Sequence, residues 1–253
     1  MFHLALRQTE GLIGCVIGLL GFALSVPDHM TLSRRAETLE VPRPRPRRDA
    51  GPLHLPVGNT GLKLCGAGRR LIEKHGTATR RSWRKLHAGM DAGTGRIVAA
   101  ALTTKERDDG AEVGPLLDQV TGPVASFTAD GAYDQEGVAA TVAGRHPEAA
   151  TNVPPRSTAV PSEAAETAPT QRDRHPQHVE PKRFAGHGRA AWQRASGHMR
   201  RSRAEAAIGG FKRVIGDGLR SRTDRRRATE VDVAVHAPDR VLELGRPISV
   251  RVA

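Results

Sequence analysis

Two acidic residues lie in local sequences where a carboxylate could do chemistry. Asp130 follows an apolar stretch and precedes Gly131, so its side chain is expected at the carboxyl end of a strand. Glu205 lies in a segment of helical periodicity, in which Arg201, Glu205 and Lys212 are spaced to share one helix face. Two carboxylates placed in this way could bind a divalent cation while the neighbouring basic side chains contact phosphate groups.

A carboxylate on a strand end and another on a helix packed across the sheet suit metal-dependent phosphodiester chemistry. That chemistry uses hard oxygen ligands to hold Mg²⁺ or Mn²⁺ ions roughly 3.5–4 Å apart. Each acid also has an ordinary interpretation. An Asp-Gly pair after a strand is commonly a turn, and Arg201 and Glu205, four residues apart, would also form a solvated ion pair on a helix surface. Spacing alone leaves both interpretations open.

Composition favours a polyanionic partner. The 253 residues include 39 Lys and Arg against 27 Asp and Glu, for a net charge of +12, and such a balance favours DNA or RNA. A generally arginine-rich composition would give the same charge. Cys15 and Cys65 are too few for a disulfide framework or a four-thiolate zinc site, which favours a cytoplasmic location.

The N-terminal region, residues 1–40, reads as two helices. The uncharged stretch 11–26 is short for a membrane span, which needs about 20 residues. We interpret it as a buried helix of a small domain, with a signal peptide as the alternative. Asp28 or Thr31 could cap the second helix, giving either a helix-turn-helix or a plain helical hairpin. Residues 41–52 follow as a basic, proline-rich linker.

The rest of the chain alternates strand and helix patterns. Strands are expected at 53–57, 83–90, 96–102, 123–129 and 149–153, and helices at 113–120, 134–143, 196–214 and 230–244. Three strands before a helix, then strand, helix and strand, predict an α/β fold with a mixed five-stranded sheet flanked by helices. Residues 154–197 read as an irregular insertion, Asp134 as a helix cap, and Pro238 as a kink or break in the last helix.

From about Leu6 to Val252 the sequence resembles bacterial insertion-sequence transposases of the DDE type. The matching blocks are residues 6–13, 26–29, 31–35, 60–63, 81–87, 128–134, 153–156, 161–175 and 242–247. Such relatives have a signature of Tyr, two residues, Arg, three residues, Glu, six residues and Lys. Here it reads His198, Arg201, Glu205 and Lys212, with only the tyrosine changed.

The resemblance implies a ribonuclease H-like catalytic domain over residues 53–247. It also implies that Asp130 and Glu205 are catalytic acids that bind Mg²⁺ or Mn²⁺ for cleavage and strand transfer of DNA ends. The first 40 residues would then be part of the family's DNA-binding region, because the chain begins inside it.

The implied partners are the DNA of the element's ends, the target DNA and a second copy of the chain. Arg201 and Lys212 would contact DNA beside the acids, and Arg34 and Arg35 would contact it from the N-terminal helices. No membrane is expected to take part.

One position departs from the family's pattern. The family's first Asp stands two residues before the Thr-Gly of the first strand, and Gly58 occupies that place. Neighbouring Asn59 is expected to point to the other face of the strand, while Asp91 lies in a hairpin turn and Asp109 in a loop. The sequence therefore predicts impaired transposition. The alternatives are an inactive DNA-binding remnant that interferes with an intact transposase, or a product that does not fold.

Overall fold

The structure is a computed structural model that describes residues 4–41, 51–64, 83–156, 158–175 and 188–243. Most of the predicted linker, residues 42–50, lies outside the described residues, as does Cys65.

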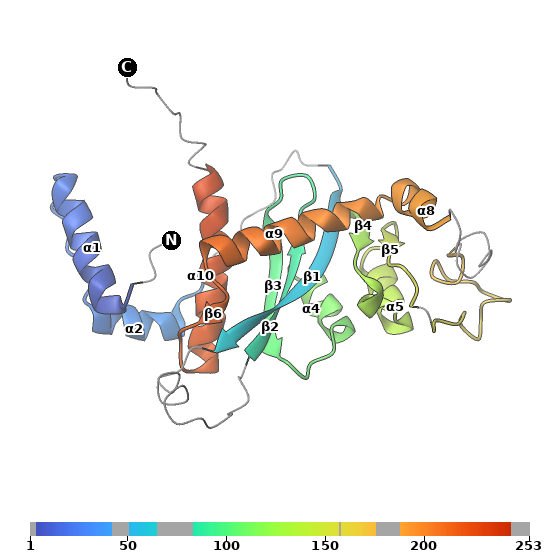
Figure 1. Cartoon of the computed structure of the whole chain (residues 1–253), viewed down its shortest axis with the longest axis horizontal. Coiled ribbons are helices and arrows are strands. Elements are labelled where there is room, and N and C mark those ends of the chain that lie inside the picture. Colours follow the sequence, from blue (N-terminus) through green and yellow to red (C-terminus); the bar gives the residue numbers. More distant parts are fainter. Residues whose placement is uncertain (1–3, 42–50, 65–82, 157, 176–187, 244–253) are drawn as a thin grey trace, which may run out of the picture.

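A mixed sheet forms the centre of the molecule (Figure 1). Its strands are β1 (Leu53–Leu64), β2 (Trp83–Met90), β3 (Ile97–Thr104), β4 (Val124–Thr128), β5 (Ala150–Asn152) and β6 (Gly218–Leu219). The order is β3-β2-β1-β4-β5, with β6 beside the end of β1. The β1–β2 and β2–β3 pairs are antiparallel, whereas β4 pairs parallel with both β1 and β5. This arrangement confirms the predicted mixed α/β fold of the ribonuclease H-like kind.

Helices cover both faces of the sheet and enclose two hydrophobic cores. They are η1 (Gly110–Glu112), α4 (Val113–Leu117) and α5 (Glu136–Arg145) on one face, and α9 (Arg201–Val214) and α10 (Asp224–Glu243) on the other. Leu55, Val57 and Phe127 pack beneath α4 and α5. Leu62 and Leu86 pack beneath α9 and α10. Because β1 contributes side chains to both cores, its alternation fixes which face each of its residues presents.

Several predicted boundaries change in the structure. β1 extends beyond the expected end at Val57 to Leu64, because the residues from Gly58 onward pair with β2. β6 is a short sixth strand that was not predicted. α10 begins at Asp224, earlier than expected, and continues through Pro238 instead of breaking there. Within the predicted insertion, the described residues 158–175 are irregular and residues 189–195 form helix α8 (Arg189–Ala195).

The first two helices form an arm beside the body of the molecule. They are α1 (Leu6–Leu19) and α2 (His29–Thr38), and Asp28 caps α2 by accepting a hydrogen bond from the backbone N–H of Thr31. The residues between them, 20–28, are more than the 3–4-residue turn of a helix-turn-helix and favour a plain helical hairpin.

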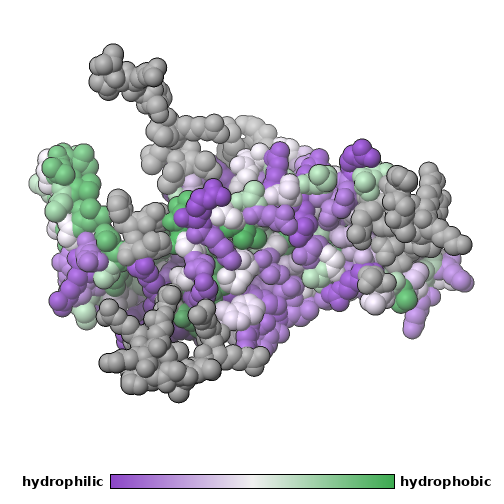
Figure 2. Space-filling view, viewed as in Figure 1, coloured by the Kyte–Doolittle hydropathy of each residue, from purple (hydrophilic) through white to green (hydrophobic). Residues whose placement is uncertain are grey.

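The expectation of a buried N-terminal helix is wrong. No residue of α1 is buried, and apolar side chains gather on its surface in Figure 2. The stretch is apolar, but α1 packs against α2, which is itself attached to α10. There Arg226 contacts the carboxylate of Glu37 at 3.1 Å, and Arg225 donates to the Glu37 carbonyl. No helix within the described ranges has the length and apolar character needed to cross a membrane.

Candidate active site

Asp130 stands at the carboxyl end of β4, as the sequence predicted. Its backbone is extended, and its Oδ1 accepts a hydrogen bond of 2.8 Å from the N–H of Ala132. This bond caps the short turn η2 (Gly131–Tyr133) and fixes the direction of the carboxylate. One carboxylate oxygen is therefore anchored in the turn, and Oδ2 faces the amino-terminal end of α9.

A clamp of charged side chains holds η2 in place. Arg156 donates through Nε to the Gly131 carbonyl at 2.8 Å and through Nη2 to the Ala132 carbonyl. The buried carboxylate of Asp134 accepts the Arg156 N–H at 2.9 Å and contacts Arg172 Nε at 2.6 Å. Asp134 therefore does not cap α5, contrary to the prediction from the sequence, because its carboxylate is bonded to Arg156 and Arg172. α5 begins two residues later, after Gln135. The clamp ties that irregular segment to the turn that carries Asp130.

The two predicted acids meet at one guanidinium group. Arg201 Nη1 lies 2.9 Å from Glu205 Oε1, and Arg201 Nη2 lies 3.6 Å from Asp130 Oδ2. The Asp130 and Glu205 side chains are 42% and 60% exposed. Exposed ion pairs of this kind contribute only about 0.2–1 kcal/mol each. The structure thus brings both carboxylates to one accessible place, with the Arg201 guanidinium between them in two weak ion pairs.

Position 58 faces the same place. Gly58 is the partner of Ala88 in the β1–β2 ladder, and Ala88 is buried in the core beneath α9. A Cβ built on Gly58 would lie 3.4 Å from Cδ1 of Ile208, which is three residues after Glu205 on α9. A carboxylate at position 58 would therefore lie on the face of the sheet that carries Glu205.

The neighbouring polar residues lie on the other face. Asn59 pairs with His87, whose Nε2 is 2.9 Å from Thr103 Oγ1. Asp109 Oδ1 lies 2.9 Å from Lys85 Nζ and 3.9 Å from His87 Nδ1. Because directly paired residues point to the same side of a sheet, Asn59 faces Asp109 and not α9.

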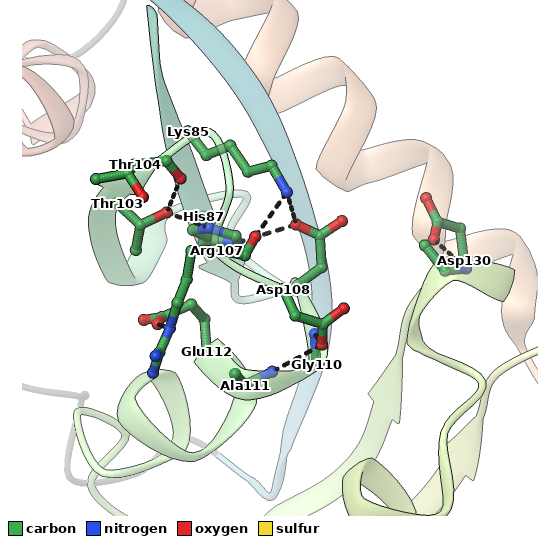
Figure 3. Close-up of polar contacts among 12 residues, drawn as sticks. Lys85, His87, Thr103, Thr104, Arg107, Asp108, Gly110, Ala111, Glu112 and Asp130 are labelled. Atoms are coloured by element: carbon green, nitrogen blue, oxygen red, sulfur yellow. Dashed lines mark hydrogen bonds and ion pairs between the residues drawn. The ribbon is translucent and has the colours of Figure 1, made fainter.

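Figure 3 shows Asp130 set apart from the polar cluster around Lys85, His87 and Asp108. Asp91 is also occupied elsewhere, because its carboxylate accepts hydrogen bonds from Gly93 N and Thr94 Oγ1 inside the β2–β3 turn. Asp91 and Asp109 are therefore both engaged in contacts away from Asp130 and Glu205.

His198 has a structural setting that the sequence did not reveal. Its Nδ1 lies 3.1 Å from the carbonyl oxygen of Asn152, at the end of β5. A carbonyl can only accept, so Nδ1 carries the proton. The ring centroid is 5.2 Å from that of Trp192 on α8. His198 thus attaches the start of α9 to β5. Burial lowers its pKa below the usual value, and the nearby positive charge of Arg201 lowers it further.

We expect the stability of the protein to fall as the pH is lowered from 7.5 to 5. Burial lowers the pKa of His54, His87 and His198. Below the usual histidine pKa of 6.5 the unfolded chain therefore binds more protons than the folded chain, and protons favour unfolding. Urea unfolding at several pH values measures this effect.

The matched variant for this prediction is His198→Gln, because an amide still donates to the Asn152 carbonyl but does not titrate. Its unfolding free energy should depend less steeply on pH than that of the parent chain. Equal slopes in the two proteins would contradict the assignment of His198 as a buried neutral ring.

The remaining predicted DNA contacts lie at different distances from the acids. Lys212 is seven residues after Glu205, about 10 Å along α9 at 1.5 Å per residue, and on a similar face. Arg34 and Arg35 are exposed on α2, which lies beyond the other end of α9 in Figure 1. The structure therefore brings Arg201 to the acids but leaves the α2 arginines remote.

The donor set fits one divalent cation with incomplete ligation. Two hard carboxylate oxygens, Asp130 Oδ2 and Glu205 Oε1, already share a cationic partner. Among the residues that the structure describes, no group of three or more His, Cys, Asp or Glu side chains is placed to hold a metal ion. A Cβ at position 58 would be in ordinary contact with Ile208 of α9, on the face of the sheet that carries Glu205.

Comparison with known protein families gives two matches. A family model described as a transposase DDE domain matches residues 50–237, which is more than half of the chain. A second family model with the same description matches residues 1–67. The longer match contains the whole sheet, both acids and α9.

Proposed function

The chain belongs to the transposase DDE domain family, and from that premise we propose that it cleaves DNA at the ends of a mobile element and joins those ends to target DNA. The reaction depends on a divalent cation, Mg²⁺ or Mn²⁺, held by Asp130 and Glu205. The observation that carries this proposal is the convergence of these two carboxylates on one guanidinium group.

The described residues supply binding and orientation. Asp130 would offer Oδ2 as a ligand because Oδ1 is held by η2, and Glu205 would offer Oε1 from helix α9. When bound, the cation would supply Lewis acidity, which activates an attacking hydroxyl and stabilises charge on the phosphate. Lys212, on the same helix, would contact a DNA phosphate two turns away and align the strand. The chemistry needs no covalent bond between protein and DNA.

The same geometry supports an impaired activity. Gly58 faces α9 and offers no oxygen, so the cation would be bound by two carboxylates and water. A second candidate function follows from this feature. The chain would bind DNA without cleaving it and interfere with an intact transposase at the same DNA ends.

The proposal includes wider contacts. Arg34 and Arg35 on the exposed face of α2 would contribute to recognition of the element's ends. Two DNA ends need two catalytic sites, so the proposed assembly is a homodimer. Cys15 is an exposed free thiol, which suits a cytoplasmic protein.

Cleavage of donor DNA with Mn²⁺ tests the proposal. We expect slow cleavage by the chain that is lost in the Asp130→Asn and Glu205→Gln variants, because each removes a charged ligand. Asp91→Asn is the matched control, since Asp91 is engaged in a turn and should not affect the rate.

Cleavage that persists in both site variants would refute the assignment of these residues. Salt-dependent DNA binding without cleavage would instead support the second candidate function. A parent chain that neither cleaves nor binds DNA would contradict both candidate functions.

A further inference from the structure

Arg201 occupies the place between the two acids where the proposed cation would bind. Its Nη1 contacts Glu205 and its Nη2 contacts Asp130, so each carboxylate directs toward the guanidinium the oxygen that it would offer to a metal ion. Resting on the proposed function, we infer that Arg201 is a built-in counter-ion that competes with the divalent cation, and that a DNA phosphate releases this competition by binding the guanidinium.

The charges explain why the competition matters in this chain. Asp130 and Glu205 together carry two negative charges, and Arg201 neutralises one of them. With Gly58 in place of an acid, no further carboxylate on β1 offsets the loss. A divalent cation approaching the DNA-free protein therefore meets a site with half of its carboxylate charge cancelled.

The contacts of Arg201 with the two carboxylates can be exchanged for contacts with DNA. The Arg201 side chain is 34% exposed, and both of its acidic partners are more exposed. Asp130 keeps its Oδ1 bond to Ala132 when Oδ2 loses the guanidinium, so the carboxylate stays oriented for a metal ion. The planar guanidinium group suits a phosphate, which it can bind through two parallel hydrogen bonds. Arg201 can therefore pass from the carboxylates to DNA without a change in the fold.

This arrangement couples the two ligands. If DNA removes Arg201 from the acids, DNA binding strengthens cation binding, and by linkage the cation strengthens DNA binding by the same factor. The cation would then be acquired mainly when a DNA strand already lies in the site. Arg201 is in this view a regulatory residue as well as a DNA contact.

Binding of Mn²⁺ to the DNA-free protein, followed by the electron paramagnetic resonance signal of free Mn²⁺, tests the first half of the inference. Arg201→Gln should bind Mn²⁺ at least about fivefold more tightly than the parent chain, in the usual range of coupling between sites. Arg201→Lys should lie between them, because a single ammonium keeps the charge but cannot span both carboxylates. Arg213→Gln is the matched control, since Arg213 is exposed on the same helix about 18 Å further along.

Binding of a fluorescent DNA duplex, measured by anisotropy with and without Mn²⁺, tests the second half. Mn²⁺ should tighten DNA binding by the parent chain and by Arg213→Gln, but much less by Arg201→Gln. The double variant Asp130→Asn and Glu205→Gln gives the effect of Mn²⁺ on DNA binding that does not involve the site.

Equal or weaker Mn²⁺ binding by Arg201→Gln would overturn the inference and leave the proposed function standing. An equal effect of Mn²⁺ on DNA binding in Arg201→Gln and the parent chain would do the same. If no variant binds Mn²⁺, including Arg201→Gln, both the inference and the metal site of the proposed function fail.

Discussion

Gly58→Asp should increase Mn²⁺-dependent DNA cleavage by about 100-fold, equivalent to roughly 2.7 kcal/mol of transition-state stabilisation. The substitution adds a carboxylate on β1 at a position that faces α9, where Asp130 and Glu205 already converge. The added Cβ would meet Ile208 at 3.4 Å, which is an ordinary contact, so the strand should accept it. The rate of donor cleavage and the affinity for Mn²⁺ both measure the effect.

Two control variants distinguish the effect of a carboxylate at position 58 from the effects of added bulk and of a carboxylate on the other face. Gly58→Ala adds the Cβ alone and should leave cleavage at the parent level. Asn59→Asp adds a carboxylate one residue away, but on the face that carries His87 and Asp109, so it should not increase cleavage either. If Asn59→Asp activates the chain as strongly as Gly58→Asp, the assignment of position 58 to the site is wrong.

Most of the sheet could be predicted because its elements are marked by local sequence. The hairpin between β2 and β3 has a turn at Asp91 whose side chain accepts from Gly93, as an Asp-containing turn should. The length of β1 could not be predicted in the same way. Gly58 and Gly61 weaken the strand pattern, and the strand persists because β2 pairs with it. Tertiary pairing overrides local preference there.

The candidate site, too, could be predicted only in part from the sequence. Asp130 and Glu205 could be proposed from the sequence because each lies in a segment that resembles a motif of the family, and the structure places both beside Arg201. Spacing also predicts that Arg201 contacts Glu205, four residues away on the helix. It does not predict the contact of Arg201 with Asp130, which depends on how α9 crosses the end of β4. Position 58 is similar, since only the packed structure shows that it faces Ile208.

The charged clamp behind Asp130 could not be predicted from local sequence patterns. Asp134 is bonded to Arg156 and Arg172, which follow it by 22 and 38 residues in a segment that reads as irregular. Composition indicated a loop there, and the described residues 158–175 form neither helix nor strand. The attachment of this loop to the site depends on one ion pair and several hydrogen bonds between residues far apart in the sequence.

Arg172→Met should destabilise the protein by about 3 kcal/mol, near the lower end of the effect of breaking a buried ion pair. The Asp134 side chain is only 3% exposed, and the substitution leaves its charge without the guanidinium that lies 2.6 Å away. The remaining bond from the Arg156 N–H offsets part of the loss. Urea unfolding measures the change, and the melting temperature should fall by about 6–12 °C for a chain of this size.

Arg145→Met is the matched control, because its partner Asp118 is 61% exposed and such surface pairs contribute at most about 1 kcal/mol. A second variant, Asp134→Leu with Arg172→Met, removes both charges and should recover part of the lost stability, since no buried charge is left unpaired. If Arg172→Met and Arg145→Met cost the same, the clamp is no stronger than a surface pair. The turn that carries Asp130 would then depend on Arg156 alone, and residues 158–175 would have no part in orienting Asp130.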